Sequence, residues 1–253
     1  MSITKAQLRW VKSLAKKSAR VESGRFFAEG AQSLRVLAEN QRWIENVYLT
    51  DDFASSNSEL TAKFAPEVLE TASEEEVERM ADANTPQGVI AICKLPSDQP
   101  RIIGTPAIFL EQVSDPGNLG TIIRTVDASG AGTVLIGSGS VDAFSPKVVR
   151  SSAGSIFNVE IIQNLSSIEA LGELRNLGYQ VFAADMEGVS VHDAELEGKH
   201  AWVFGNEAHG LSAETLGAVD QRVSIPIFGK AESLNLSVAA GVVLYHSAFA
   251  QRG

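Results

Sequence analysis

The second half of the chain, from residue 107 onward, alternates short continuous apolar runs with longer stretches in which apolar residues recur every three or four positions. The short runs predict buried strands, and the longer periodic stretches predict helices. The expected strands are 107–113, 133–138, 159–163, 180–186, 201–207 and 222–227. The expected helices are 118–131, 167–178, 212–220 and 236–250, and the segment 146–157 is expected to be a helix followed by irregular chain. Apolar strands that alternate with helices indicate an α/β fold whose parallel sheet is covered on both faces.

The first half of the chain predicts a smaller α/β domain. A basic helix is expected at the N-terminus, and a second helix at 25–40 with Phe26 and Phe27 at its start. Ser73 followed three residues later by Glu76 is a capping box, which predicts the start of another helix. The other expected elements are strands at 44–50 and 88–95 and a short helix at 55–65.

Residues 96–106 concentrate proline, glycine and polar side chains, so we expect a linker there between domains at 1–95 and 107–253. A chain of 253 residues that is 44% hydrophobic is long enough for two such cores. The one cysteine, Cys93, excludes an internal disulfide and a cysteine-rich metal site, and it suits a reducing cytoplasm. We therefore expect a cytoplasmic protein with no metal, and no stretch reads as a signal peptide or a membrane span.

Charge is distributed unevenly along the chain. The formal net charge is −10, which argues against a protein that binds nucleic acid over its whole surface. Residues 1–25 nevertheless carry a net charge of +6, which leaves about −16 for the rest. This segment either contacts a polyanion or forms a solvated basic helix. Its basic residues are Lys5, Arg9, Lys12, Lys16, Lys17, Arg20 and Arg25.

Three loops that follow predicted strands carry more polar residues than a turn requires. In the first loop, Asp115-Pro-Gly is turn chemistry and Asn118 is the expected N-cap of the next helix. Arg124 lies six residues further on, about 9 Å along a helix. Its long side chain, which leans toward the helix N-terminus, could reach back to the loop. An ordinary surface arginine is the alternative.

In the second loop, Gly205 and Gly210 bracket a carboxylate, Glu207, directly after an apolar strand. The third loop ends in three polar residues that alternate with leucines at the start of the last helix: Ser233, Asn235 and Ser237. One polar residue would suffice as an N-cap, so three suggest a bound polar ligand. Ligands bind at the carboxyl ends of the strands in such sheets, and all three loops are expected there.

Together, these loops resemble the three motifs of the SpoU/TrmH family of S-adenosylmethionine-dependent RNA ribose 2′-O-methyltransferases. The matching segments are Asn118-Leu-Gly-Thr-Ile-Ile-Arg124, Gly205-Asn-Glu207-Ala-His-Gly210, and Ile225-Pro-Ile followed by Ser233-Leu-Asn235-Leu-Ser-Val-Ala-Ala-Gly. Residues 18–37 are similar to the start of the family's N-terminal substrate-binding domain, whose fold is like that of ribosomal protein L30e.

The resemblance implies a catalytic domain with a deep C-terminal trefoil knot, a homodimer, and S-adenosylmethionine as cofactor. It implies that Gly205, Ile225 and Leu234 bind the cofactor, largely through backbone atoms. Ser233 and Asn235 would support them.

By the same resemblance, Arg124 is the central catalytic residue, and Asn118 and Glu207 position it. Such an arginine is either a general base or an electrostatic clamp for a phosphate and the emerging oxyanion. Because the pKa of arginine lies far above neutral pH, deprotonating it at pH 7 costs at least roughly 7 kcal/mol. The clamp is therefore the milder hypothesis.

The resemblance also gives the basic N-terminus a role in gripping RNA phosphates. The residues concerned are Arg9, Lys12, Lys16, Lys17, Arg20 and Arg25. Ribosomal RNA is the favoured substrate because of the additional N-terminal domain, with transfer RNA as the alternative. A non-catalytic RNA-binding protein on the same fold is the main rival interpretation. A nucleotide-binding oxidoreductase is disfavoured because no G-x-G-x-x-G follows the first strand.

Overall fold

The computed structural model describes residues 3–96 and 101–252, and the chain divides into two compact units. One unit contains the N-terminal residues up to the gap together with Phe144–Asn158. The other contains the residues from the gap to Ala143 and those from Val159 onward. The segment 144–158 therefore packs with the first unit, although its neighbours in the chain belong to the second.

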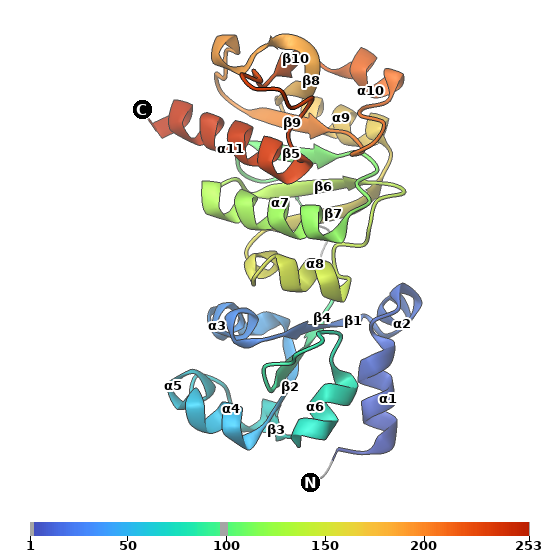
Figure 1. Ribbon diagram of the computed structural model, residues 1–253, viewed down its shortest axis with the longest axis vertical. Coiled ribbons are helices and arrows are strands. Elements are labelled where there is room, and N and C mark those ends of the chain that lie inside the picture. Colours follow the sequence, from blue (N-terminus) through green and yellow to red (C-terminus); the bar gives the residue numbers. More distant parts are fainter. Residues whose placement is uncertain (1–2, 97–100, 253) are drawn as a thin grey trace. The chain divides into compact units, whose positions relative to one another are not determined.

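The first unit is built on a four-stranded sheet with the order β1-β4-β2-β3 (Figure 1). These strands are β1 (Arg25–Glu29), β2 (Ile44–Leu49), β3 (Leu69–Thr71) and β4 (Val89–Lys94). Its α-helices are α1 (Lys5–Ser13), α2 (Lys17–Ser23), α3 (Ala31–Glu39), α4 (Asp51–Ser56), α5 (Ser58–Thr61), α6 (Glu74–Met80) and α8 (Pro146–Ser151). Short 3₁₀ turns are η1 (Gln41–Trp43), η2 (Pro66–Val68) and η3 (Ser155–Phe157).

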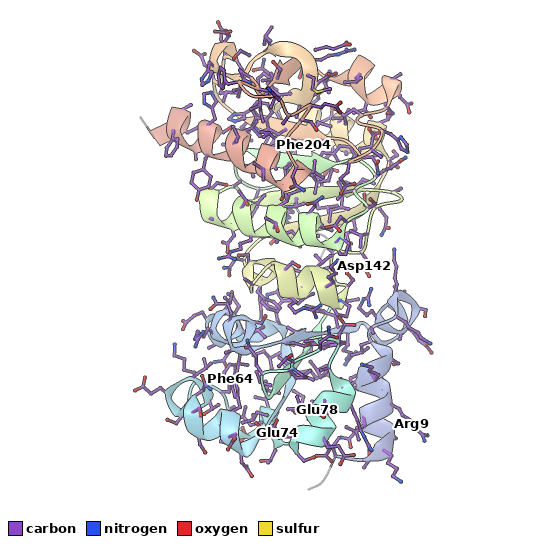
Figure 2. The ribbon with its side chains drawn as sticks, in the orientation of Figure 1. Arg9, Phe64, Glu74, Glu78, Asp142 and Phe204 are labelled. Atoms are coloured by element: carbon purple, nitrogen blue, oxygen red, sulfur yellow. The ribbon has the colours of Figure 1, made fainter. Side chains whose placement is uncertain are left out.

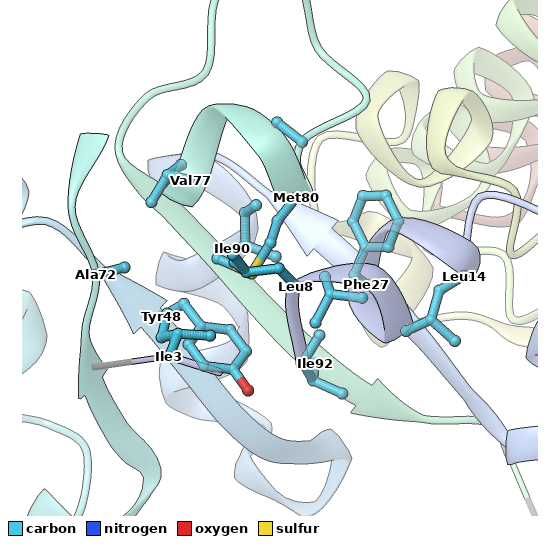
Figure 3. Close-up of a cluster of buried hydrophobic side chains, with 12 residues drawn as sticks. Ile3, Leu8, Leu14, Phe27, Tyr48, Ala72, Val77, Met80, Ile90 and Ile92 are labelled. Atoms are coloured by element: carbon cyan, nitrogen blue, oxygen red, sulfur yellow. The ribbon is translucent and has the colours of Figure 1, made fainter. Parts of the chain in front are cut away.

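A cluster of buried side chains from α1, α6 and the sheet forms one core of this unit (Figure 3). It includes Leu8 of α1, Val77 and Met80 of α6, and Ile90 of β4. The capping box predicted for α6 is confirmed, because the Ser73 side chain accepts from the Glu76 amide while the Glu76 side chain accepts from the Ser73 amide. This burial fixes α1 against α6.

The helix predicted at 25–40 is wrong in its first part, because residues Arg25–Glu29 form strand β1. Phe27 packs into the core shared with α1 and α6, whereas Phe26 contacts the rings of Phe144 and Phe157, with centroids 4.9 and 6.1 Å away. Alternate residues are thus buried on opposite faces, which is the pattern of a strand. Helix α3 begins only after Gly30, whose φ of 90° no helix residue adopts.

The second unit is an α/β layer structure with a six-stranded parallel sheet of order β10-β8-β9-β5-β6-β7, which confirms the expected fold class. Its strands are β5 (Ala107–Leu110), β6 (Thr133–Gly137), β7 (Glu160–Leu165), β8 (Gln180–Ser190), β9 (His200–Phe204) and β10 (Gln221–Ser224). Its helices are α7 (Pro116–Ser129), α9 (Ser167–Asn176), α10 (Ala213–Ala218), α11 (Leu236–Arg252) and the 3₁₀ turn η4 (Val191–Asp193).

Alternate residues of the central strands point to helices on opposite faces of this sheet. Phe109 and Val203 join the cluster of buried side chains that packs against α9. Trp202 faces the other layer, where its indole N–H donates to Ser247 of α11 at 2.9 Å. Helices α7 and α11 lie side by side in that layer (Figure 1). The trefoil knot that the resemblance implies stays a prediction.

The predicted N-cap of α7 is wrong by three residues. Helix α7 begins at Pro116, and its N-cap is Asp115, whose carboxylate accepts from the Asn118 amide at 2.7 Å. Proline is well placed at the first helical position, where its missing N–H has no partner to lose. Because Asp115 does the capping, the side chain of Asn118 is free for other contacts.

No helix in the described parts of the chain is long and apolar enough to cross a membrane.

Candidate active site

The loops after β5 and β9 meet at the carboxylate of Glu207. Asn118 donates its Nδ2 to Glu207 Oε1 at 3.0 Å, and the Ser114 hydroxyl donates to Oε2 at 3.1 Å. The backbone amides of Ser114 and Asp115 donate to the same carboxylate, each at 3.3 Å. Partial burial alone would raise the pKa of Glu207, but these hydrogen bonds outweigh it and hold the pKa below its usual value. Glu207 is therefore a charged acceptor at neutral pH.

The loop before α11 joins the same junction through Asn235. The Nδ2 of Asn235 donates to Asn118 Oδ1 at 3.0 Å. The Oδ1 of Asn235 accepts from the amide and hydroxyl of Ser237, at 2.9 and 2.7 Å, and so caps the start of α11. Asn118 thus uses both ends of its amide, one toward Glu207 and one toward Asn235. The three side chains form a continuous hydrogen-bonded chain across three loops.

A tight turn shapes the second loop. Asn206 and Gly210 exchange backbone hydrogen bonds in both directions, at 3.0 and 2.9 Å. A Cβ atom at Gly205 would overlap the backbone of Gly210 and Leu211, so only glycine fits there. The Asn206 side chain donates to the carbonyl of Gln112 at 2.8 Å and ties this turn to the first loop.

Glu111, which the sequence reasoning assigned only to a strand, is a buried carboxylate at the end of β5 with 7% of its surface exposed. It accepts from the hydroxyls of Ser167, Ser212 and Thr215 at 2.6, 2.9 and 2.7 Å, and from the Ser212 amide at 2.9 Å. Burial alone would raise its pKa, but these hydrogen bonds lower it below the usual value. Ser212 follows the second loop directly, so Glu111 anchors that loop from beneath.

Arg124, the predicted catalytic residue, lies on the exposed side of α7. Its helical neighbours Ile122, Ile123 and Val126 are fully buried and hold α7 in place. The side chain of Arg124 forms no hydrogen bond or ion pair with any described residue. Its guanidinium is therefore available to a bound molecule.

The residues expected to hold the cofactor occupy the second and third loops. Gly205 is buried at the end of β9, Ile225 is half-buried after β10, and Ser233 and Leu234 are exposed. Residues 226–234 donate no hydrogen bond to, and accept none from, any other described segment. Free backbone groups beside apolar side chains match what S-adenosylmethionine offers, namely a hydrogen-bonding adenine and ribose and an amino-acid end. The donor set in these loops therefore fits that cofactor.

The basic residues predicted to bind RNA divide into two groups. Arg9, Lys12, Lys16 and Lys17 are exposed. Arg20 is only 3% exposed, and its guanidinium donates to the carbonyls of Leu14 and Ala15 at 2.7 and 2.9 Å. Arg25 is half-buried and forms an ion pair with Glu45 at 2.7 Å. Arg20 thus has a structural role between α1 and α2, which no local sequence signal indicated.

Comparison with known proteins identifies the family. Residues 106–245, more than half of the chain, match the SpoU rRNA methylase family. The chain belongs to this family. Residues 5–91 match the MRM3-like substrate binding domain.

Relatives of similar length carry both parts. The chain is 30% identical to the 23S rRNA (guanosine(2553)-2'-O)-methyltransferase RlmP of Bacillus subtilis, over 93% of each chain. It is also 30% identical to the 23S rRNA (uridine(2479)-2'-O)-methyltransferase of Streptomyces viridochromogenes, over 94% of this chain and 87% of that one.

Solved structures resemble the whole chain as well. One is described as a TrmH-family RNA methyltransferase from Porphyromonas gingivalis, with a TM-score of 0.86, 28% identity and full coverage of both chains. Another is an AdoMet-bound rRNA methyltransferase from Sinorhizobium meliloti, with a TM-score of 0.85 and 28% identity over 99% of this chain and 97% of that one.

Proposed function

We propose that this SpoU-family protein methylates the ribose 2′-hydroxyl of a nucleotide in ribosomal RNA, with S-adenosylmethionine as the methyl donor. The observation that carries the proposal is the hydrogen-bonded chain Glu207–Asn118–Asn235, which joins the three family motifs at one edge of the sheet. Relatives that are similar over the full chain are named as 23S rRNA 2′-O-methyltransferases, which supports ribosomal RNA as the substrate class.

When bound, S-adenosylmethionine supplies an electrophilic methyl group on a positively charged sulfur. The ribose 2′-oxygen would bond to this methyl group as the carbon–sulfur bond breaks, and the hydroxyl proton would pass to solvent water. Within this chain, Asn118 and Glu207 hold the first and second loops together, and Arg124 lies exposed in the third turn of α7. Their task is to hold the ribose and its phosphate against the methyl group.

Arg124 acts in this proposal as a clamp for phosphate and the developing negative charge on oxygen. Its guanidinium is exposed and forms no hydrogen bond or ion pair with another described residue, so all its donors are available to a phosphate. Its planar fork suits bidentate hydrogen bonds to phosphate oxygens. Adding free guanidines of different pKa to Arg124→Ala distinguishes a clamp from a general base. Methyl-transfer rates that vary with the pKa of the added guanidine would contradict the clamp.

Gly205, Ile225 and Leu234 bind the cofactor in this proposal through their backbone atoms. The free backbone groups of residues 226–234 support this assignment. Ser233 offers a free hydroxyl, whereas the amide of Asn235 is already used by Asn118 and Ser237. Asn235 would therefore shape the pocket wall more than it contacts the cofactor.

The RNA-binding proposal rests on the exposed basic residues Arg9, Lys12, Lys16 and Lys17. Arg20 contributes to it only by fixing the turn between α1 and α2. The match of residues 5–91 to a substrate-binding domain supports this region as the RNA-binding part. Ribosomal RNA as target supports a cytoplasmic location.

A homodimer completes the proposal, and an exposed apolar stripe on α11 supports it. The stripe consists of Val238, Val242, Tyr245 and Phe249, whose spacing of four, three and four residues places them on one face. Phe249 is 71% exposed, which is unusual for a phenylalanine without a partner surface. A second copy would bury this face.

The test is transfer of labelled methyl from S-adenosylmethionine to unmodified ribosomal and transfer RNA, with wild type and Arg124→Ala compared. Label that enters ribosomal RNA, protects one phosphodiester from alkaline cleavage and disappears with Arg124→Ala is expected. Label in transfer RNA alone would overturn the substrate assignment. Absence of both transfer and cofactor binding would overturn the enzymatic function and leave a non-catalytic RNA-binding protein.

A further inference from the structure

A pocket in the first unit lies between α1 and α6. Its volume is about 270 Å³, and four of its five lining side chains are basic. The five lining residues are Lys5, Leu8, Arg9, Lys12 and Arg79. The acidic side chains of α6 do not line it within the described structure. In Figure 2 the Arg9 side chain extends from α1, while Glu74 and Glu78 lie on α6.

Helix packing brings these cations together. Positions 5, 8, 9 and 12 fall on one face of a helix, because their spacing follows the helical repeat. Leu8 is buried against Val77 and Met80 of α6, so this face of α1 is turned toward α6. The ammonium of Lys12 donates to the carbonyl of Ala81, directly after α6. Burial of Leu8 against α6 therefore holds the neighbouring basic side chains of α1 around one cavity.

The positive charge in the pocket is largely uncompensated. Lys5 and Arg9 are exposed and form no ion pair with any residue that the structure describes. Arg79 pairs with Glu75 at 2.7 Å, but both side chains are more than half exposed. Such a surface pair contributes less than about 1 kcal/mol, and the guanidinium keeps donors to spare. Four mutually repelling cations are stabilised by an anion placed among them.

We propose that this pocket binds one phosphate group of the RNA backbone, with Arg79 as a contact residue alongside Arg9, Lys5 and Lys12. The proposal rests on the proposed function, since it assumes an RNA substrate. Two arginines provide planar forks for phosphate oxygens, and two lysines provide compact charges. The sequence could not indicate Arg79, because it lies in an otherwise acidic helix, 67 residues after Lys12 in the chain.

The experiment measures the affinity of unmodified, in vitro transcribed ribosomal RNA as a function of salt, without turnover. The variants are Arg9→Gln, Arg79→Gln and the double substitution. Lys63→Gln is the matched control, since Lys63 is an exposed cation of the same unit, paired with Glu39 instead of lining the pocket. Thermal unfolding of each variant checks that the fold is retained.

Each pocket variant is expected to weaken RNA binding about tenfold, as for loss of one charge-assisted hydrogen bond. The slope of log affinity against log salt should fall by about 0.7 to 0.9, the value for one phosphate. The double variant should lower the slope no further, because both arginines hold the same phosphate. Lys63→Gln should match wild type, and cofactor affinity should be unchanged throughout.

Pocket variants that bind RNA like Lys63→Gln would overturn the proposal. If the slope of log affinity against log salt falls twice as far in the double variant, the two arginines contact separate phosphates. That result would overturn the proposal that they share one phosphate. Wild type that binds RNA without methylating it would count against the proposed function only. The two failures are therefore distinguishable.

Discussion

Replacing the buried carboxylate of Glu111 tests whether the core under the second loop depends on its charge. In Glu111→Gln the side chain keeps one acceptor oxygen and gains an NH₂ group. The hydroxyls of Ser167 and Thr215 can rotate and accept from this group, but the Ser212 amide cannot. If the remaining side-chain oxygen still accepts from the Ser212 backbone amide, that hydrogen bond loses its charge assistance. If the new NH₂ group points there instead, two donors face each other.

The magnitude follows from that single amide. A hydrogen bond to a charged group contributes about 1.5–3 kcal/mol, so Glu111→Gln should lower the free energy of unfolding by that amount at pH 7. The folded-state pKa of Glu111 lies below its unfolded value. Its stabilisation is therefore complete above the unfolded pKa of about 4.3 and is lost as pH falls through the lower folded pKa. The difference between wild type and variant should shrink over that acid range.

The assay is urea unfolding followed by the fluorescence of Trp202, at fixed protein concentration and at several pH values. The chain has three tryptophans, and Trp10→Phe with Trp43→Phe leaves Trp202 of the second unit as the reporter. Glu173→Gln is the matched control, because Glu173 is exposed on α9 and should change stability by less than about 0.5 kcal/mol. A Glu111→Gln variant as stable as this control, or a difference that does not vary with pH, would refute the reasoning.

Three further predictions concern the site and its assembly. Asn118→Ala removes the link between Glu207 and Asn235 and should reduce kcat about 100-fold in a methyl-transfer assay, because misplaced groups lose that much. Gly205→Ala forces a Cβ atom into the backbone of the second loop and should abolish cofactor binding measured by calorimetry. Val242→Glu, which charges the apolar stripe of α11, should dissociate the proposed homodimer in sedimentation experiments.

Each of these has a contrary outcome. Wild-type turnover by the Asn118 variant would mean that the hydrogen-bonded chain has no part in positioning. Undiminished cofactor affinity after Gly205→Ala would place the pocket away from the second loop. An unchanged sedimentation coefficient for the α11 variant would mean that the apolar stripe of α11 is not a dimer contact.

Much of the fold was predictable because strand and helix patterns depend on neighbouring residues. The alternation of apolar strands and periodic helices beyond residue 107 predicted the parallel sheet, since a doubly covered sheet demands continuous apolar strands. The capping box of Ser73 and Glu76 was predictable for the same reason, as its partners lie three residues apart. The meeting of the three loops was predictable because parallel strands end at one edge of the sheet.

The prediction failed where distant residues decide local structure. Phe26 and Phe27 fit a helix by pattern, but the rings of Phe144 and Phe157 bury one of them on the far side of a strand. Asp115 and Asn118 are both good N-caps, and Pro116 favours the earlier helix start. In the structure Asp115 accepts from the Asn118 amide, while the Asn118 side chain donates to the distant Glu207.

The sequence by itself determined the α/β class and the edge of the sheet at which the three motif loops meet. Only the tertiary structure decided which of those residues touch: the Glu207–Asn118–Asn235 chain, the donors around Glu111, and the internal use of Arg20. The physical reason is the distance along the sequence over which each interaction acts. Caps and periodicity act within about four residues, whereas a buried charge is satisfied by whichever donors the packed core brings to it.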